Sequence, residues 1–511
     1  MKKEMQKIIQ FKNILLDKNN KSLTKQTLEN SSYSFMTNLI SKAGSLIFTI
    51  ILARLILPEL FGLYSLALSI ILTIATFTDL GLSSTISKYL SESLARGKKG
   101  ETEARSRLRF LLKIKLSLVF IVSLLIFLLA PIISTVVFHR VSLIMPLQIG
   151  AIYLFVMGLQ SALSAVFYPL RKLKYTLYSE VIFQVLRIVL FVILIGIYKS
   201  VSNILISLVI TMLASAVFYL FALIFINKHL LFGKIIPVER RKMTLFWGWT
   251  IILSSSLVLF GHIDTFMLGF FVEDSFIGYY SILLSLVASA AGFITFGGIF
   301  LPIFTQIKGE QLNRGFSKAI KYSAMLSIPA AVGLAFIILP LIRIIYGVDY
   351  APLEFNFPML VASVFLCLLV IEGPITAILN SLFMAKDRVK LPAILLIILT
   401  AINIVLNIAF IKIALPFGAQ WALVGVSLAT FLTRYLNLGI LAYLSFKNFR
   451  LGLNKETFIM PAAAAVLMLV FLFLFNYIFK PAIIGSAIMI ILAAAVYFIN
   501  IYLLSSKWSQ K

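Results

Sequence analysis

The chain is poor in the residues that build metal and redox centres. It contains one cysteine and three histidines among 511 residues. A lone cysteine, Cys367, forms neither an intrachain disulfide nor a thiolate cluster, so we expect a small apolar core residue. His139, His229 and His262 are scattered along the sequence, which argues against a zinc or haem site. A Gly-x4-Gly-Lys-Ser/Thr segment is also missing, which excludes ATP hydrolysis through a phosphate-binding loop, and we expect no cofactor.

Charged residues are scarce too, and acidic ones are the scarcest. Only 13% of the chain is charged, with 19 acidic residues against 45 Lys and Arg, whereas 61% is hydrophobic and the mean hydropathy is +1.04. A soluble fold could not bury so much apolar surface, so the composition indicates an integral membrane protein. Short segments of strict period two, which a membrane β-barrel requires, are missing as well. We therefore predict an all-α membrane protein.

Long apolar runs separated by short polar breaks fill the chain. Fourteen of them are long enough to cross the hydrocarbon layer as a helix of about 20 residues. We place these spans at 34–57, 61–90, 113–137, 145–168, 180–198, 203–226, 244–271, 276–305, 317–346, 358–384, 390–413, 421–445, 457–478 and 482–505. The longest outer loop, about 346–357, is too short for the extramembrane platform of a glycosyltransferase. The protein is therefore expected to move a substrate and not to convert it.

The net charge of +26 follows this topology. Of the 45 basic residues, 36 fall on one set of alternating loops and tails, 6 on the other set and 3 inside spans. Positive charge stays cytoplasmic during insertion, so both termini are predicted to be cytoplasmic, and nucleic-acid binding is not needed to explain the charge. The charged N-terminal tail does not resemble a cleavable signal peptide. Residues 1–30 instead predict a basic amphipathic helix on the inner leaflet, or a simple anchor, with the apolar face Met5, Ile8, Ile9, Leu15 and Leu16.

A sequence repeat divides the chain. Shifting the turn at 61–69 by 216 positions aligns it with 277–285, and five of nine residues are identical: Gly62/Gly278, Tyr64/Tyr280, Ser65/Ser281, Leu68/Leu284 and Ser69/Ser285. Membrane transporters often contain such repeats. We predict six-helix bundles at 31–226 and 244–445 around a central cavity, a cytoplasmic linker at 227–243, and two additional helices in 446–511.

The first turn also carries a family resemblance. The segment Ala53-Arg-Leu-Ile-Leu-Pro-Glu-Leu-Phe-Gly-Leu-Tyr-Ser-Leu-Ala67, followed by Thr78-Asp-Leu-Gly-Leu-Ser-Ser84, resembles the Wzx-type polysaccharide flippases. Asp264-Thr-Phe-Met-Leu-Gly269 and Gly278-Tyr-Tyr-Ser281 are similar to the same family, whose superfamily includes multidrug extruders and the lipid II flippase. The resemblance covers about residues 30–450. It implies two bundles around a cavity and outward movement of a lipid-linked oligosaccharide.

Basic residues inside the spans are the first candidate site residues. A charge at mid-membrane costs about 2.5–3.5 kcal/mol unless it faces protein, water or a partner. Lys42, Arg187 and Arg434 lie well inside spans and could bind an anionic phosphate head group, with Asn38 and Asn380 binding sugar hydroxyls. The alternative is that each cation pairs with a nearby acid and only holds the bundle together, as Arg187 could with Glu180.

Acidic residues inside the spans are candidates for ion coupling. Asp79, Asp264 and Glu372 each lie on or beside a polar stripe of a span. A carboxylate that is protonated in one state and paired or Na⁺-bound in another can bias which side a cavity faces. Internal pairing with Lys42 or Arg434 would explain the same positions. The sequence does not distinguish H⁺ coupling, Na⁺ coupling and no coupling.

The expected function is that of a flippase in the cell membrane. Its substrate would be an oligosaccharide on a polyprenyl phosphate or pyrophosphate, used for cell-surface polysaccharide or glycan assembly. Its partners would be this lipid, membrane lipids, H⁺ or Na⁺, and proteins of glycan assembly. The alternatives are a multidrug or toxin extruder of the same superfamily and, less favoured by the short outer loops, a membrane enzyme of polysaccharide assembly.

Overall fold

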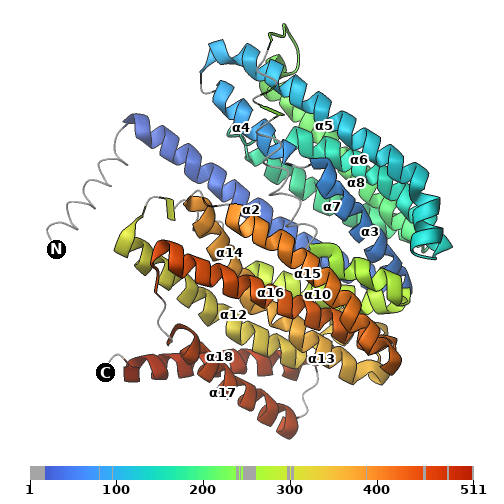
Figure 1. Ribbon diagram of the computed structural model, residues 1–511, viewed down its shortest axis with the longest axis vertical. Coiled ribbons are helices and arrows are strands. Elements are labelled where there is room, and N and C mark those ends of the chain that lie inside the picture. Colours follow the sequence, from blue (N-terminus) through green and yellow to red (C-terminus); the bar gives the residue numbers. More distant parts are fainter. Residues whose placement is uncertain are drawn as a thin grey trace, which may run out of the picture. The chain divides into compact units, whose positions relative to one another are not determined.

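The computed structural model describes the chain apart from short gaps. Not described are residues 1–17, 80, 95, 238–240, 242, 245–260, 296–299, 301–303, 306, 387, 389, 453–455, 480–482 and 509–511. The described residues form helices throughout and no strand, as Figure 1 shows. The all-α prediction is therefore confirmed. The amphipathic face predicted between Met5 and Leu16 lies outside the described residues.

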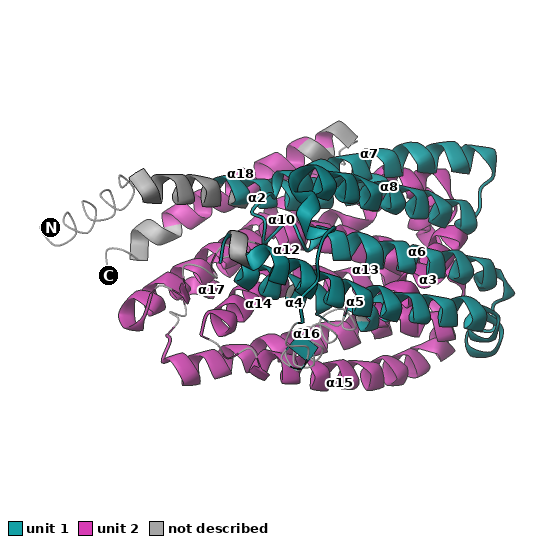
Figure 2. Cartoon of the chain, turned by 90° about the horizontal axis from the view of Figure 1, so that it is seen from above, with its two compact units in different colours: residues 1–48, 74–255 teal, residues 49–73, 256–511 magenta. Residues whose placement is uncertain are grey.

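The chain divides into two compact units, which Figure 2 shows in different colours. The first unit contains residues 1–48 and 74–255, and the second contains 49–73 and 256–511. The boundaries therefore fall within helix α2 (Lys18–Leu55) and helix α3 (Pro58–Asp79). The units do not coincide with the predicted bundles at 31–226 and 244–445, because residues 49–73 pack with the second unit. The division into two six-helix bundles therefore stays a prediction.

Long helices with an apolar core build the first unit. After α2 and the end of α3 come α4 (Leu82–Leu94), α5 (Lys98–Ile132), η1 (Ile133–Val137), η2 (Val141–Leu143), α6 (Ile144–Ser164), α7 (Lys174–Ile197), α8 (Val201–Asn227) and η3 (Lys228–Leu230). The core joins α4, α5, α8 and the segment after α6 through buried residues such as Leu82, Leu108, Phe167 and Leu223. The Phe167 and Tyr219 rings lie 5.1 Å apart, so aromatic packing supports the same core.

The second unit begins with the end of α2 and most of α3. Its further helices are residues 261–271, α10 (Asp274–Ile294), α12 (Gly309–Ile345), η4 (Val348–Tyr350), η5 (Leu353–Phe355), α13 (Asn356–Cys367), α14 (Leu369–Ala385), α15 (Lys390–Ala414), η6 (Leu415–Phe417), α16 (Ala419–Phe449), α17 (Glu456–Phe479) and α18 (Ile483–Trp508). Alanines and methionines of α17 and α18 pack on α12. The Tyr497 hydroxyl donates a hydrogen bond to the Met325 carbonyl of α12 at 2.7 Å. The two helices outside the repeat therefore pack on this unit.

The predicted spans agree with the helices in order. Twelve helices of the described part are long and apolar enough to cross a membrane, and a shorter apolar helix, Ile488–Leu503, falls in the last predicted span. The remaining predicted span, 244–271, is described only at 244 and from 261 onward. The chain is therefore a multi-pass membrane protein.

The second predicted span, 61–90, needs a correction. It is not one helix, because α3 ends at Asp79 and α4 begins at Leu82. Gly81 adopts φ +74°, a left-handed conformation that glycine reaches without steric cost. Hydropathy averaged over a whole span does not show this break, although polar residues such as Asp79, Ser83 and Ser84 lie beside it.

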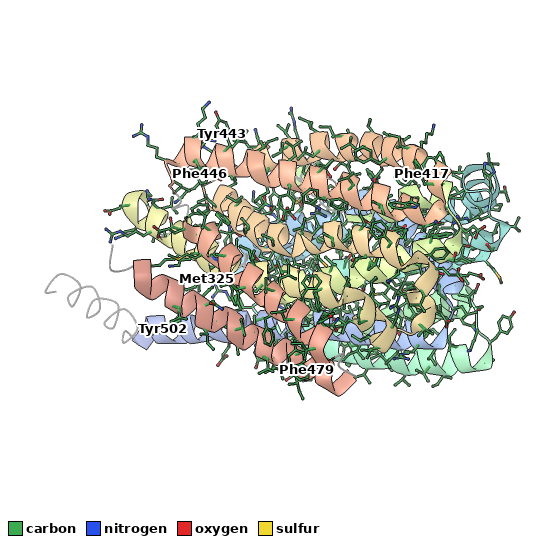
Figure 3. The ribbon with its side chains drawn as sticks, turned by 90° about the horizontal axis from the view of Figure 1, so that it is seen from below. Met325, Phe417, Tyr443, Phe446, Phe479 and Tyr502 are labelled. Carbon is green, nitrogen blue, oxygen red and sulfur yellow. The ribbon has the colours of Figure 1, made fainter. Side chains whose placement is uncertain are left out.

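Aromatic side chains mark helix ends in the second unit. Figure 3 places Tyr443 and Tyr502 toward one end of their helices and Phe417 and Phe479 toward the other. All four are exposed, each by more than 60%. Tyrosines toward helix ends are typical of the interfaces of a bilayer, so Tyr443 and Tyr502 fit a membrane-spanning unit.

The two glycines of the repeat lie against each other where α3 meets α10. A Cβ at Gly62 would clash with the Asp274 carbonyl and lie 2.9 Å from the Gly278 nitrogen, and a Cβ at Gly278 would clash with the Pro58 carbonyl. Only glycine allows backbones to approach so closely.

The turn before α3 is also tied to α12 and η4. Arg54 donates to the Ile345 carbonyl at 2.6 Å, and the Tyr350 hydroxyl donates to the Ile56 carbonyl at 3.0 Å.

Candidate functional site

Asp264 is the centre of a buried polar cluster in the second unit. Its side chain, on the helix at 261–271, is 5% exposed. One carboxylate oxygen accepts hydrogen bonds from the Tyr280 hydroxyl at 2.8 Å and the Thr430 hydroxyl at 2.6 Å. The other oxygen accepts from the Asn407 amide at 3.0 Å. These contacts join four helices of the second unit at one carboxylate.

Two asparagines on α15 extend this cluster. The Asn407 amide also donates to the Asn403 carbonyl oxygen at 3.1 Å, and the Asn403 amide donates to the Thr433 hydroxyl at 3.1 Å. The side-chain oxygen of Asn407 is buried without a hydrogen-bond partner among the described residues. Neither asparagine is among the residues that the sequence predicted for a site. Their signal is the spacing of four residues inside an apolar run, which places two amides on one helix face.

The chemistry of this cluster fits a small monovalent cation or a proton. It combines one carboxylate with neutral amide and hydroxyl oxygens, the ligands that hard cations prefer. Within the described part of the chain, no group of three or more His, Cys, Asp or Glu residues could hold a metal ion. A single carboxylate suits a single positive charge, so the cluster does not fit a divalent metal centre.

Glu372 and Arg434 lie near the same cluster. Glu372, on α14, is 2% exposed and accepts a hydrogen bond from Thr376 at 2.6 Å. The Arg434 guanidinium, on α16, interacts electrostatically with both Glu372 and Asp264. The structure thus places Arg434 within electrostatic range of both acids, and its two interpretations, ion pairing and head-group binding, stay predictions. Asn380 lies half-buried two turns after Glu372 on α14.

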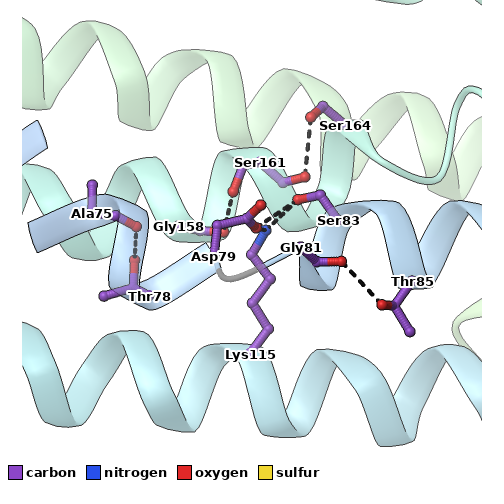
Figure 4. A network of polar contacts seen from close by, with 10 residues as sticks. All are labelled: Ala75, Thr78, Asp79, Gly81, Ser83, Thr85, Lys115, Gly158, Ser161 and Ser164. Atoms are coloured by element: carbon purple, nitrogen blue, oxygen red, sulfur yellow. Dashed lines mark hydrogen bonds and ion pairs between the residues drawn. The ribbon is translucent and has the colours of Figure 1, made fainter. Parts of the chain in front are cut away.

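Asp79 belongs to a second cluster, in the first unit, which Figure 4 shows. The Lys115 ammonium of α5 donates to an Asp79 carboxylate oxygen at 2.5 Å and to the Ser83 hydroxyl at 2.6 Å. Ser83 donates to the same Asp79 oxygen at 2.7 Å. The Lys115 side chain is fully buried, whereas that of Asp79 is 40% exposed. This ion pair bridges the break between α3 and α4.

Lys115 lies inside the predicted span 113–137, but among the 36 basic residues of loops and tails it was counted with the loop at about 88–115. That count was wrong for Lys115, because helix α5 begins at Lys98 and this residue lies well inside it. Its signal was periodic: Lys115 follows Leu108 and Leu111 and precedes Val119 on the buried face of the helix. A lysine on that face needs a countercharge, and Asp79 supplies it.

The remaining sequence-predicted residues lie on α2 and α7 of the first unit. Asn38 and Lys42 are exposed side chains one turn apart on α2. On α7, Gln184 donates to Glu180 at 2.6 Å and accepts from Arg187 at 2.6 Å. The Arg187 guanidinium also lies 4.3 Å from the centre of the Phe48 ring on α2. The alternative of Arg187 pairing with Glu180 therefore takes an indirect form, through Gln184.

Comparisons with solved structures identify the fold. A lipid II flippase, MurJ, in an inward closed conformation, matches with a TM-score of 0.69 at 15% identity, over 94% of this chain and 99% of that one. A multidrug resistance MATE transporter of the MOP superfamily, facing inward, matches with 0.64 at 15% identity, over 80% and 95%. A MOP superfamily transporter from Pyrococcus furiosus matches with 0.50 at 14% identity, over 82% and 97%. The chain therefore has the fold of these transporters.

Sequence comparison gives the family. No curated protein matches the chain. The family model described as polysaccharide biosynthesis protein matches residues 27–308, which is more than half of the sequence. Together with the shared fold, this match confirms the resemblance to polysaccharide flippases that the turn before Gly62 indicated. The chain is a multi-pass membrane protein and belongs to the polysaccharide biosynthesis protein family.

Proposed function

We propose that this protein is a flippase for an oligosaccharide linked to a polyprenyl phosphate or pyrophosphate. The observation that carries the proposal is the family match over residues 27–308 on a fold shared with a lipid II flippase over 94% of the chain. The substrate would move from the cytoplasmic to the outer leaflet of the cell membrane by alternating access. It would then serve the assembly of a surface polysaccharide or glycan. Proteins of glycan assembly are the partners that this role implies.

The proposed orientation has both termini in the cytoplasm. Its support is the unequal distribution of Lys and Arg, with 36 on one set of loops and tails and 6 on the other. In this orientation the turn at 56–58 and the segment 346–357 face outward. The linker at 227–243 faces the cytoplasm, where the lipid-linked oligosaccharide would be loaded.

The proposed head-group ligands are the basic residues inside the spans. Lys42 and Arg434 would bind the anionic phosphate or pyrophosphate, helped by Arg187, because ionised donors form the strongest hydrogen bonds to phosphate oxygens. Asn38 and Asn380 would bind sugar hydroxyls. Arg434 also interacts electrostatically with Asp264 and Glu372. Binding of the head group at Arg434 would therefore compete with these two carboxylates for its positive charge. Substrate binding could in this way change the affinity of the carboxylates for a coupling ion.

The proposed coupling site is the Asp264 cluster, with Glu372 and Asp79 as further acids. Asp264 is buried with neutral hydroxyl and amide groups around it, so binding of Na⁺ or H⁺ would neutralise its charge. An ion that binds one conformation better than the other shifts the balance between them. The neutral oxygens around Asp264, including the unpartnered one of Asn407, favour Na⁺ over H⁺ as the first ion to test.

Purified protein in liposomes tests the function against its alternatives. Three assays are run in parallel: transfer of a labelled lipid-linked oligosaccharide between leaflets, uptake of a cationic dye, and glycosyl transfer from a nucleotide sugar. The proposal expects activity in the first assay only. Dye transport alone would instead support a multidrug extruder, which the MATE match makes the second candidate. Glycosyl transfer would contradict the proposal.

A further inference from the structure

A pocket of about 610 Å³ lies in the second unit beside the approach of Gly62 and Gly278. Its walls come from the start of α3, the start of α10, the end of α12 and the segment around η4 and η5. This volume is in the range of pockets that hold small molecules, which is roughly 300–1,000 Å³. In the proposed orientation the segments that line the pocket lie on the outer side of the membrane.

The lining of the pocket is acidic. Three carboxyl groups, from Glu59, Asp349 and Glu354, face one guanidinium, from Arg343. Arg343 already donates to the Ala351 carbonyl at 2.8 Å and to the Asn356 side chain at 3.1 Å. These bonds fix the outer segment in place and use part of the donor capacity of Arg343. The carboxylates, in contrast, offer acceptors to a ligand that donates hydrogen bonds.

Tyr279 supplies a second, independent sign of a ligand. Its side chain lines the pocket and is 8% exposed. Its ring packs against Phe276 and Phe355, with ring centres 5.8 Å and 6.3 Å away. Its hydroxyl makes no hydrogen bond to the described residues, although it interacts electrostatically with all three carboxyl groups. The hydroxyl is open to the pocket, so it can donate a hydrogen bond to a bound ligand or accept one from it.

The spacing of the acids identifies the class of ligand. They do not converge as a group that could hold a metal ion, according to the described residues. Separated carboxylates suit instead a larger ligand with hydrogen-bond donors on several sides. A sugar ring presents hydroxyls in this way, and an aromatic wall adds apolar contact. An anionic group, such as a uronic acid or a phosphate, would be repelled by the excess of negative charge.

We propose that this pocket is an outer glycan subsite, which binds a neutral or amino sugar of the translocated oligosaccharide and excludes acidic sugars. The subsite rests on the proposed function and adds a substrate class to it. Its walls belong to α3, α10 and the segment after α12, so a bound sugar contacts all three. Binding there would hold the glycan on the outer side after the head group has crossed.

Binding of free sugars to the full-length protein in lipid nanodiscs tests the subsite. Glucose, glucosamine and glucuronic acid are compared by saturation-transfer NMR and by titration. Glucose and glucosamine should bind, and glucuronic acid should bind about tenfold more weakly or not at all, because the carboxylates of the pocket repel its negative charge. Ethylamine controls for simple cation binding. If it binds as tightly as glucosamine, or if glucuronic acid binds as tightly as glucose, the proposal is wrong.

Matched variants locate the binding. Tyr279→Phe removes only the hydroxyl, and Glu354→Gln removes one charge. Each should weaken glucose or glucosamine binding about tenfold. Glu273→Gln is the control, because Glu273 is an exposed acid at the start of α10 that does not line the pocket. Unchanged binding in both pocket variants, in protein that elutes normally from a sizing column, would overturn the subsite.

Failure of the subsite and failure of the proposed function give different results. A wild-type protein that flips the lipid-linked oligosaccharide but binds none of the free sugars retains its function and refutes the subsite. A protein that binds glucose at this pocket, with loss in the Tyr279→Phe variant, but flips no oligosaccharide supports the subsite and refutes the flippase.

Discussion

Gly62 and Gly278, which are 216 positions apart and equivalent in the repeat, lie against each other where α3 meets α10. The repeated turn is therefore also a packing contact. Side chains at these positions would meet backbone atoms of Pro58 and Asp274, which cannot move aside as a flexible side chain can. The identity of the two turns thus has a structural cause within the second unit: each copy must leave room for the other.

Gly62→Ala and Gly278→Ala are each expected to destabilise the protein by about 1–3 kcal/mol, the typical cost of overpacking. Gly439→Ala is the matched control, because a Cβ at Gly439 meets no atom within 4 Å and alanine favours the helix. Thermal unfolding in detergent measures the difference. Equal melting temperatures for all three variants would show that the two turns do not make this contact.

The Asp79–Lys115 pair predicts an asymmetric response to mutation. Asp79→Asn leaves a fully buried ammonium without its countercharge, whereas Lys115→Met leaves a carboxylate that is 40% exposed. Asp79→Asn should therefore destabilise more than Lys115→Met, by less than the roughly 3–5 kcal/mol typical of fully buried pairs. The double variant should regain stability relative to Asp79→Asn alone.

Thermal unfolding of the three variants checks this order. Arg314→Gln is the control, since the Arg314–Glu310 pair is about three-quarters exposed and should contribute little. If Lys115→Met were the more damaging change, or if the double variant were the least stable, the ion pair would not hold the break between α3 and α4.

Sodium is expected to stabilise the protein through Asp264. Binding of an ion to the folded state raises its melting temperature, so NaCl should stabilise the wild type more than KCl at equal ionic strength. Asp264→Asn and Asn407→Leu should remove the difference between the two salts. Glu310→Gln, which changes an exposed acid, should retain it. A sodium effect that survives Asp264→Asn would place the ion elsewhere, and stabilisation by low pH without a sodium effect would indicate a proton.

Much of the fold could be predicted from the sequence because hydropathy and charge are averaged over whole spans. The positions of the helices followed from such patterns, whereas the repeated glycines followed from the identical residues of the two turns. The break at Gly81 could not be predicted in this way, because an average over a span does not reveal a change of backbone conformation at one residue.

The candidate site was less predictable, for a physical reason. Charged residues stand out inside an apolar span, so Asp264, Glu372 and Arg434 were predicted as site residues, and the structure places Arg434 within electrostatic range of both acids. Asn403 and Asn407 are neutral and carry no such signal. Lys115 sits near a basic loop in the sequence, and only its partner across the helix break reveals its role. Contacts between distant segments decide these cases.

The proposed orientation predicts a definite pattern of reporter fusions. Reporter fusions after Leu94 and after Lys242 should show that these positions are cytoplasmic. A fusion after Asp349 should show that this position is outside. The reason is the excess of Lys and Arg on the loops assigned to the cytoplasm. Activities reversed at all three positions would invert the topology, and the pocket beside Asp349 would then face the cytoplasm.

Movement of a labelled lipid-linked oligosaccharide between leaflets of protein-containing liposomes tests the central claim most directly. The label is read by an enzyme that cannot cross the membrane and removes only outward-facing glycan. With wild-type protein, the flippase proposal expects the lipid-linked oligosaccharides of the inner leaflet, which are protected at first, to become accessible to the enzyme. With Lys42→Gln and Arg434→Gln at normal protein levels, they should become accessible more slowly. If the oligosaccharides of the inner leaflet stay protected with the wild-type protein, as they do in empty liposomes, the account is contradicted.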